Sequence, residues 1–438
     1  MSVPQETAKR ARLLVSPLAA GRHWAGAALA TCMIGWGTNQ FTPMLLLYRA
    51  RLGLSAPVVE AMFALYAIGL VPGLLVGGSV SDRIGRRPVV LFALITSMIG
   101  GGVLMAGTHG AGWLFAGRLI VGLGSGSAFS AGAAWIKELS APPYDETTAP
   151  GAGARRASGA MTAGFAAGPL VAGALAQWAP APTILPYLPQ LAGAGWALIL
   201  AARTPETVRS GAAGAAARHW RRPRTRGMGH PRLLRVVLPA APWVFISVAV
   251  GFVYVPGLVA GHAAGIPIAF AAAAALAAAA GGVAVQPVAR RLARRDHPGR
   301  PRLLITGLAL VAVGMLAEAA ITAAGGLGPW QPVLALLASA ELGCGYGITL
   351  IFGLTEVARL ARPEDLARLT GVFQVVCYTG FAAPNMLSLL QGAISAPGLL
   401  LLTAALAALT LAVTTWQAQR TAAGNAVRCS PPLPSRSA

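Results

Sequence analysis

The sequence predicts an all-α membrane protein with twelve transmembrane helices in two lobes of six. Three observations lead to this fold class. Of the 438 residues, 55% are hydrophobic and only 11% are charged, whereas a soluble domain carries roughly 25% charged residues. Twelve apolar stretches each approach the ~20 residues that a spanning helix needs. The basic residues lie in blocks between these stretches, which is the arrangement expected of loops outside a bilayer.

The twelve stretches are predicted as spanning helices in chain order. They cover residues 24–48, 58–80, 88–107, 112–136, 158–178, 183–202, 236–260, 266–288, 302–324, 331–357, 368–391 and 397–418. Pro and Gly are tolerated in membrane helices, so Pro186 and Pro189 blur only the boundary of the sixth span. The first stretch is too long for the apolar core of a cleavable leader, and further spans follow it.

The basic residues predict the orientation. With the N-terminus in the cytoplasm, 31 of the 34 Lys and Arg residues fall in tails and loops on that side. The opposite loops hold only Arg49 and Arg51, and Arg118 alone lies inside a span. This asymmetry predicts a multi-pass protein of the cell (inner or plasma) membrane with both termini cytoplasmic. Topology therefore accounts for the net charge of +21, and nucleic acid is not expected as a partner.

The predicted spans divide the chain into five parts. A cytoplasmic tail (1–22) precedes an N-terminal six-helix lobe (23–203), and a basic cytoplasmic linker (204–235) precedes a C-terminal six-helix lobe (236–418). A second cytoplasmic tail (419–438) ends the sequence. The linker is expected to lie near anionic headgroups rather than to bind a specific partner.

The two halves resemble each other. The second predicted span ends GGSVSDRIGRR from Gly77, and the eighth ends GGVAVQPVARR from Gly281. The fifth and eleventh spans share Gly-Phe-Ala-Ala, beginning at Gly164 and Gly380. Span n matches span n+6 in the same orientation, which is a parallel repeat about an axis along the membrane normal. The preference for Arg over Lys, together with much Ala and Gly, indicates a GC-rich genome, and a bacterial source is expected.

The loop between the second and third spans carries the most specific motif. It reads Gly78-Ser-Val-Ser-Asp82-Arg83-Ile-Gly85-Arg86-Arg87. Its residues, spacing and position resemble the loop signature of the major facilitator superfamily. Together with the repeat, the resemblance covers roughly residues 20–420. It implies a two-lobed secondary transporter that works by alternating access.

This resemblance implies an inner gate. In the family, the matching Asp caps the N-terminus of span 11, near Arg368 here, where a helix favours negative charge. Asp82 is the only acid in a basic loop, so an ionic partner is expected, and Gly85 permits a tight turn. A plain topogenic loop is the alternative. Gln286 stands where the second copy would have its Asp, so a latch there is weaker or absent.

Two acids at the ends of spans 4 and 10 are assigned to the same gate. Glu138 and Glu356 are expected to pair with the groups Arg83–Arg87 and Arg290–Arg295, respectively. Solvated helix ends are the alternative. The predicted inner-gate residues are therefore Gly78, Asp82, Arg83, Gly85, Arg86, Arg87, Glu138 and Glu356.

The fifth span carries Gly164-Phe-Ala-Ala-Gly168-Pro169-Leu-Val-Ala-Gly173. The three glycines would permit close helix packing, and the proline would bend the helix. The run is similar to the glycine-proline motif of the family's exchangers and drug-efflux members, which implies efflux. Ordinary small-residue packing is the alternative. Span 6 ends Thr204-Pro205-Glu206-Thr207, a short match to a frequent family ending.

Charges inside the spans are candidates for function, because a charge at mid-bilayer costs at least ~2.5–3.5 kcal/mol. Arg118 matches a position that the family's efflux members use in proton coupling, with structural pairing or snorkelling as the alternative. Glu341 in span 10 is the first choice for a titrating residue, with a structural acid as the alternative. Glu318 is expected near the outer surface of a peripheral span, and Glu60 is expected to be solvated.

Polar side chains in spans 1, 7 and 11 are candidates for contacts with a substrate, since they need a cavity or a partner helix. A largely apolar pocket with few polar anchors would suit amphiphilic organic molecules. The predicted cavity residues are Asn39, Gln40, Tyr254, Gln374, Tyr378 and Asn385.

The motifs that are absent exclude other classes. No phosphate loop precedes either lysine, so an ATP-driven pump is not expected. No cysteine pair has metal-ligand spacing, and no nucleophile-base set appears in the loops. The predicted function is proton-coupled efflux (antiport) of a small molecule, without enzyme activity, cofactor or metal. Its partners are the substrate, protons and the lipid bilayer, and the chain is expected to be a monomer. There are two alternatives. One is a proton-coupled importer (symporter), and the other is a membrane-embedded sensor or enzyme without transport.

Overall fold

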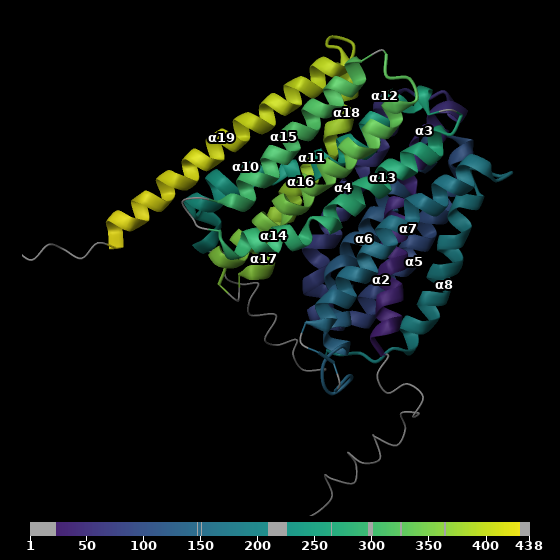
Figure 1. Cartoon of the computed structure of the whole chain (residues 1–438). Helices are drawn as coiled ribbons and strands as arrows, with labels where there is room; N and C mark the ends of the chain where they lie inside the picture. Colours follow the sequence, from purple (N-terminus) through teal and green to yellow (C-terminus); the bar gives the residue numbers. More distant parts are fainter. Residues whose placement is uncertain are drawn as a thin grey trace, which may run out of the picture. The chain divides into compact units, whose positions relative to one another are not determined.

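The described residues of the chain are almost entirely helical (Figure 1). The computed structural model describes residues 23–146, 148–149, 151–208, 226–263, 265–296, 301–324, 326–362 and 365–429. The expected N-terminal tail, most of the basic linker and the end of the C-terminal tail lie outside them. Within the described residues, eleven helices are long and apolar enough to cross a membrane. This confirms the all-α membrane fold class.

The first predicted span is a broken helix. It consists of α2 (His23–Asn39) and α3 (Phe41–Leu52), separated by a turn at Gln40. Pro43 explains the break, because it has no N–H for the carbonyl of Asn39 and its ring crowds that carbonyl. Together with the eleven longer helices, this pair accounts for the twelve predicted spans.

Contacts divide the described residues into two compact units. Unit 1 takes those within Met1–Phe41 and Leu65–Arg221, and unit 2 takes those within Thr42–Ala64 and Arg222–Ala438. Residues 42–64, which the sequence predicts to belong to the first lobe, therefore pack with the second half of the chain.

Unit 1 is a bundle in which small residues bring helix backbones together. In α7, side chains at Gly164 and Gly168 would collide with the backbone of α2 at Cys32 and Trp36. Pro169 and Gly173 are also buried in α7. The helices of unit 1 are α2, most of α4 (Ala56–Ile84), α5 (Arg86–Met105), α6 (Ala111–Leu139), α7 (Ala152–Trp178) and α8 (Leu188–Arg203).

Unit 2 contains a span that departs from α geometry twice. This span runs over 233–262 and includes the π-helical turns η5 (Leu233–Val237) and η6 (Val250–Tyr254). Such turns are rare and cluster at functional sites. The remaining helices of unit 2 are α3, the start of α4, α10 (Leu238–Ala240), α11 (Pro242–Ala249), α12 (Val255–Val259), α13 (Pro267–Ala284), α14 (Gln286–Arg294), α15 (Arg302–Ala323), α16 (Trp330–Leu360), α17 (Leu366–Tyr378), η8 (Thr379–Ala382), α18 (Ala383–Leu390) and α19 (Ala396–Cys429).

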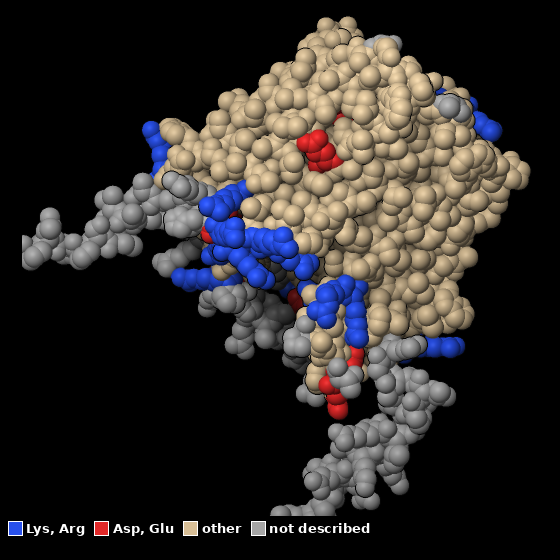
Figure 2. All heavy atoms as spheres, viewed as in Figure 1, with Lys and Arg blue, Asp and Glu red and all other residues tan. Residues whose placement is uncertain are grey.

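The exposed helix walls suit lipid rather than water. Large apolar side chains such as Ile68, Leu337, Trp178 and Trp196 are each at least 60% exposed. On the face in Figure 2, Lys and Arg gather at the ends of helices, while the walls between them carry few charges. Apolar exposure of this extent on many helices would favour aggregation in water.

Candidate functional site

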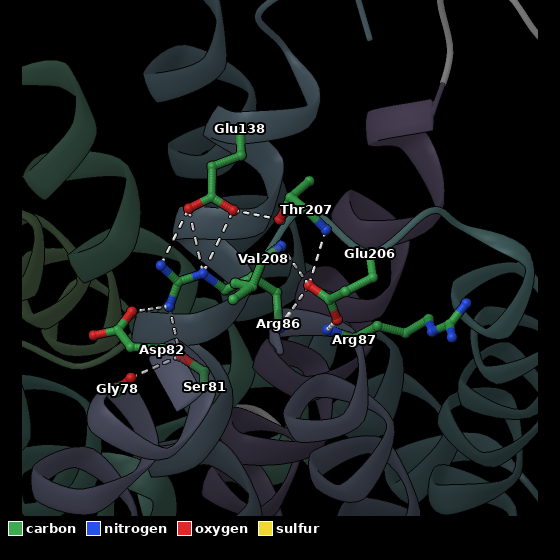
Figure 3. Close-up of polar contacts among 9 residues, drawn as sticks. All are labelled: Gly78, Ser81, Asp82, Arg86, Arg87, Glu138, Glu206, Thr207 and Val208. Carbon is green, nitrogen blue, oxygen red and sulfur yellow. Dashed lines mark hydrogen bonds and ion pairs between the residues drawn. The ribbon is translucent and has the colours of Figure 1, made fainter. Parts of the chain in front are cut away.

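Arg86 is the centre of a polar cluster where α4 meets α5 (Figure 3). Its guanidinium pairs with Asp82 at 2.5 Å and with Glu138 of α6 at 3.1 Å. It also donates a 2.7 Å hydrogen bond to the hydroxyl of Ser81, which in turn donates to the carbonyl of Gly78. Asp82 thus has the ionic partner expected for it, and Glu138 pairs within the predicted arginine group. The guanidinium therefore joins the end of α4 to the end of α6.

Glu206, which follows α8, holds the start of α5 in place. Its carboxylate accepts the backbone N–H groups of Arg86 and Arg87, both at 2.9 Å. A carboxylate is favourable here because the first N–H groups of a helix carry partial positive charge. Gly85 precedes them with φ +112°, and a side chain there would collide with the Glu206 carboxylate. Only glycine allows both this backbone conformation and this approach.

Glu206 and Thr207 are members of this cluster that were not predicted from the sequence. Glu206 also accepts the N–H groups of Thr207 at 2.8 Å and Val208 at 3.0 Å, and the Thr207 hydroxyl donates to Glu138. The motif Thr204-Pro205-Glu206-Thr207 was the available signal, but spacing along the chain does not reveal that span 6 ends beside span 3. We call Ser81, Asp82, Arg86, Glu138, Glu206 and Thr207 the Arg86 network. Arg83 is exposed beside it, and the Arg87 guanidinium donates to the carbonyls of Ala202 and Thr204.

Unit 2 has a second ionic cluster with partners that differ from the prediction. The buried carboxylate of Glu356 pairs with Arg232 at the start of span 7 and with Arg359 at 3.0 Å. The expected pairing of Glu356 with Arg290–Arg295 is therefore wrong. Arg290 is exposed and donates instead to Gln286 of its own helix at 3.2 Å.

Asp296 joins this second cluster from the end of α14. One of its oxygens lies 3.8 Å from the Arg359 guanidinium, and the other accepts the N–H of Leu303 at 3.2 Å. Burial raises the pKa of the Asp296 carboxyl, although the N–H groups of Leu303 and Arg302 and the Arg359 charge act in the opposite direction. The folded chain therefore binds this proton more tightly than the unfolded chain does.

Asp296→Asn is expected to raise the thermal stability of the detergent-solubilised protein at pH 7. Since folding raises this pKa, stability is lost as pH rises from the ordinary Asp value through the folded value. Asn keeps the acceptor for Leu303 without that cost, so the gain should shrink toward pH 4. We expect at most about 2–4 °C, the shift that ~1 kcal/mol gives a domain of 150–250 residues. Melting curves from pH 4 to 8, with exposed Glu146→Gln as control, test this. A lower melting temperature at pH 7 would mean that the Arg359 contact dominates.

Arg118 is 1% exposed in the interior of unit 1. It donates to the carbonyl of Thr38 at 3.1 Å, next to the break between α2 and α3. Its guanidinium carbon lies 4.7 Å from the ring centre of Phe41 and 4.6 Å from that of Tyr66. Cation–π contact with two rings partly replaces hydration of the charge. Arg118 therefore stabilises the broken first span while keeping a charge inside the membrane.

The acids inside the spans differ in burial. Glu341 of α16 is partly buried. Glu318, expected near the outer surface, is 0% exposed, and Glu60, expected to be solvated, is 5% exposed. The expectation for Glu60 is wrong, whereas Glu318 does lie in the last turns of α15 but is enclosed there. Helix packing explains the result: Glu318 lies where α15 meets α16, and Glu60 lies where the start of α4 meets Ser388 of α18.

The predicted cavity residues of unit 1 lie at the break in the first span. The amide of Asn39 donates to the carbonyl of Phe165 at 3.5 Å. Gln40 is 1% exposed, and its amide N and O have no hydrogen-bond partner among the described residues. A buried amide without partners is costly, which makes Gln40 a candidate for binding a polar group.

The predicted cavity residues of unit 2 lie around a set of aromatic rings. Tyr378 stacks on Phe245 at 4.6 Å between ring centres, and Phe245 also lies 4.5 Å from Phe381. Gln374 is partly buried on α17, one turn before Tyr378. We call the connected rings Phe63, Phe245, Phe252, Tyr346, Tyr378 and Phe381 the aromatic cluster.

Two further cavity candidates are held by hydrogen bonds beside the aromatic cluster. Asn385 donates to the carbonyl of Pro57 at 2.6 Å, and the Tyr254 hydroxyl accepts from Gln391 at 2.8 Å. Tyr254 is 1% exposed. Both side chains are therefore engaged within unit 2 in this conformation.

Short stretches of the sequence are similar to known transporters. It is 36% identical over 115 residues to myo-inositol transporter 1 of Cryptococcus neoformans, which covers 26% of this chain and 20% of that protein. It is 31% identical over 78 residues to the multidrug resistance protein MdtL of Klebsiella pneumoniae, covering 18% and 20%. The glucose transporter GlcP of Staphylococcus epidermidis matches at 28% over 117 residues, covering 27% and 26%. The matches thus span about a fifth to a quarter of each relative.

Solved structures share the fold over most of the chain. A POT family transporter in complex with 5-aminolevulinic acid superposes with a TM-score of 0.69 at 13% identity, covering 90% of this chain and 95% of that one. The xylose transporter XylE of E. coli gives 0.61 at 17% identity, covering 89% and 97%. The family model of the Major Facilitator Superfamily matches residues 27–384. Twelve spans, the Asp82 loop and this match lead to one conclusion: the chain belongs to the Major Facilitator Superfamily of small-molecule transporters.

Proposed function

We propose that this chain exports small amphiphilic organic molecules in exchange for protons. The two lobes, 23–203 and 236–418, give the substrate alternating access to the two sides of the membrane, with both termini in the cytoplasm. The Arg86 network acts as the inner gate. The partners are the substrate, protons and bilayer lipid, and the working unit is a monomer.

The observation that carries this proposal is the presence of ionisable groups inside apolar spans. Arg118 is fully buried between aromatic rings, and Glu341 is partly buried on α16. Such groups are expensive in a membrane and mark ion or substrate pathways. A carboxyl group on a helix that lines the pathway can bind and release a proton during each cycle.

The substrate class follows from the aromatic cluster. Its rings pack edge-to-face and stacked, and Tyr378 and Phe245 remain partly exposed. Aromatic walls with few polar groups suit ligands that have an apolar body and a polar end. The glycine-proline run of α7 and the similarity to a multidrug resistance protein favour efflux.

A second candidate is proton-coupled import of a small metabolite. Two of the relatives are by name transporters of myo-inositol and glucose, which favours this reading. A sensor or enzyme without transport is the third candidate, and the Arg86 network and family membership disfavour it.

Inside-out vesicles without an energy source separate these candidates. Each compound of a panel of amphiphilic aromatic molecules and sugars is added to the bath, and lumenal pH is followed with a dye. Antiport should alkalinise the lumen, because substrate entry drives protons out. Symport should acidify it, which would favour the importer. If radiolabelled substrate enters with no change in lumenal pH, proton coupling is wrong. Vesicles without the protein are the control.

A further inference from the structure

The carboxyl group of Glu318 is enclosed inside unit 2. Its side chain is 0% exposed, and neither oxygen accepts a hydrogen bond of ordinary geometry from the described residues. It lies on α15 and faces Ser339 of α16, where these two helices pack along their length. A polar group in such a place needs a hydrogen-bond partner.

The hydroxyl groups near Glu318 already donate elsewhere. Ser339 donates to the carbonyl of Gly251 at 3.0 Å. Thr322, one turn along α15, donates to the backbone carbonyl of Glu318 itself at 2.7 Å. Neither hydrogen is therefore free for a carboxylate at this position.

No cation offsets a negative charge here within the described residues. Glu341 of α16 is the charged group that acts on Glu318, and it has the same sign. The neighbouring segments α11 and α12 contain no ionisable side chain, and the Arg residues of α14 lie by the opposite end of α15. In α19 the first ionisable residue is Arg420, far along the helix. An ionised carboxylate in this setting would be strongly disfavoured.

The acceptor of the Ser339 bond is a carbonyl that the helix cannot satisfy. In the π turn η6, the N–H of Val255 bonds to the carbonyl of Val250. The donor to the Gly251 carbonyl in a π turn would be Pro256, which has no N–H. Ser339 takes the place of that missing donor.

We propose that Glu318 is a proton-binding site that is linked through Ser339 to the geometry of the π turn Val250–Tyr254. In the structure described here the carboxyl is protonated, its O–H donates to the Ser339 oxygen, and Ser339 donates to Gly251. When the proton passes to the Glu341 carboxylate, the ionisable group that acts on Glu318, a Glu318 carboxylate remains and the Ser339 hydroxyl turns to donate to it. The Gly251 carbonyl then takes the N–H of Val255, which converts the turn to α geometry.

This step would couple a proton to the candidate cavity. Tyr254 belongs to the same turn, and its hydroxyl accepts from Gln391. Rewinding the turn changes the direction of the Tyr254 side chain. The coupling, though not the proton site itself, rests on the proposed function.

Infrared spectroscopy of the protein in vesicles tests the site without transport. At pH 7, where an exposed glutamate is ionised, the wild type should show the C=O band of a protonated carboxyl. Glu318→Gln should lose this band, and Glu146→Gln, which changes an exposed acid, should keep it. Ser339→Ala should shift the band, because the carboxyl loses its acceptor. An identical spectrum for the wild type and Glu318→Gln would overturn the proposal, as would a band that Ser339→Ala leaves unmoved.

Transport tests the coupling separately. In Glu318→Gln, the increase in substrate uptake that a pH gradient produces should be at least tenfold smaller than in the wild type. Substrate exchange at equal pH should be kept. A pH response equal to that of the wild type would overturn the coupling. If the wild type itself moves no protons while the infrared band is present, the proposed function fails and the proton site stands.

Discussion

Asp82→Asn is expected to lower substrate turnover by at least about tenfold, which is ~1.4 kcal/mol, with near-normal amounts of protein in the membrane. The Asp82 side chain is 54% exposed, so its ion pair with Arg86 adds little to folding stability. Asn can still accept a hydrogen bond from Arg86 but carries no charge. If the Arg86 network is the inner gate, loss of this charge changes the balance between open and closed states. Initial rates of uptake into vesicles, normalised to protein amount, measure the effect.

A second variant of the same network separates gating from folding. Glu206 accepts four backbone N–H groups, so Glu206→Ala should lower the melting temperature and the yield. Each lost hydrogen bond to a charged group costs about 1.5–3 kcal/mol. Exposed Glu146→Gln should change neither property. Unchanged turnover in Asp82→Asn would refute the gate assignment, and a melting temperature as low as that of Glu206→Ala would make Asp82 structural.

Glu341→Gln is expected to reduce proton-driven flux at least about tenfold and to leave exchange of labelled for unlabelled substrate largely intact. Gln is close to Glu in shape and hydrogen bonding but cannot release a proton at these pH values. Because Glu341 is partly buried and not enclosed, the substitution should not unfold the chain. Flux driven by a pH gradient and exchange at equal pH are measured in the same vesicles.

The comparison between the two flux modes decides the role of Glu341. Driven flux that survives in Glu341→Gln would make the residue structural. Equal loss of both modes would place it in substrate binding rather than in coupling. Glu341→Asp, which keeps a titrating group, should recover part of the driven flux.

Local sequence was sufficient for much of the fold. The apolar lengths predicted the spans, and eleven of them are continuous helical segments, some of which contain 3₁₀ or π turns. The motif around Asp82 lies where α4 ends and α5 begins: Asp82 is in the last turn of α4, and Arg86, its partner, is the first residue of α5. Two residues four positions apart in the chain are never far from each other, so a contact of this kind depends little on tertiary packing.

Contacts across helices could not be predicted in the same way. The burial of Glu60 and the enclosure of Glu318 could not be predicted, because the burial of a residue depends on which neighbouring helix its side chain faces. Glu356 was predicted to pair with the basic group Arg290–Arg295. Its observed partner is Arg232, which lies 124 residues away in the chain. Glu206 caps a helix that begins 120 residues earlier in the chain.

The sequence by itself determined that the chain crosses a membrane and belongs to a two-lobed transporter family. This was possible because the length of an apolar span and the charge of a loop are properties of each segment by itself. Tertiary structure alone decided which acids are paired, enclosed or capping. The pairing, enclosure and capping of these acids depend on distances of a few ångströms between side chains of different helices. Those distances cannot be predicted from a local sequence pattern. The motif around Asp82 could be recognised in the sequence. The enclosure of the Glu318 carboxyl could be recognised only from the way the helices pack.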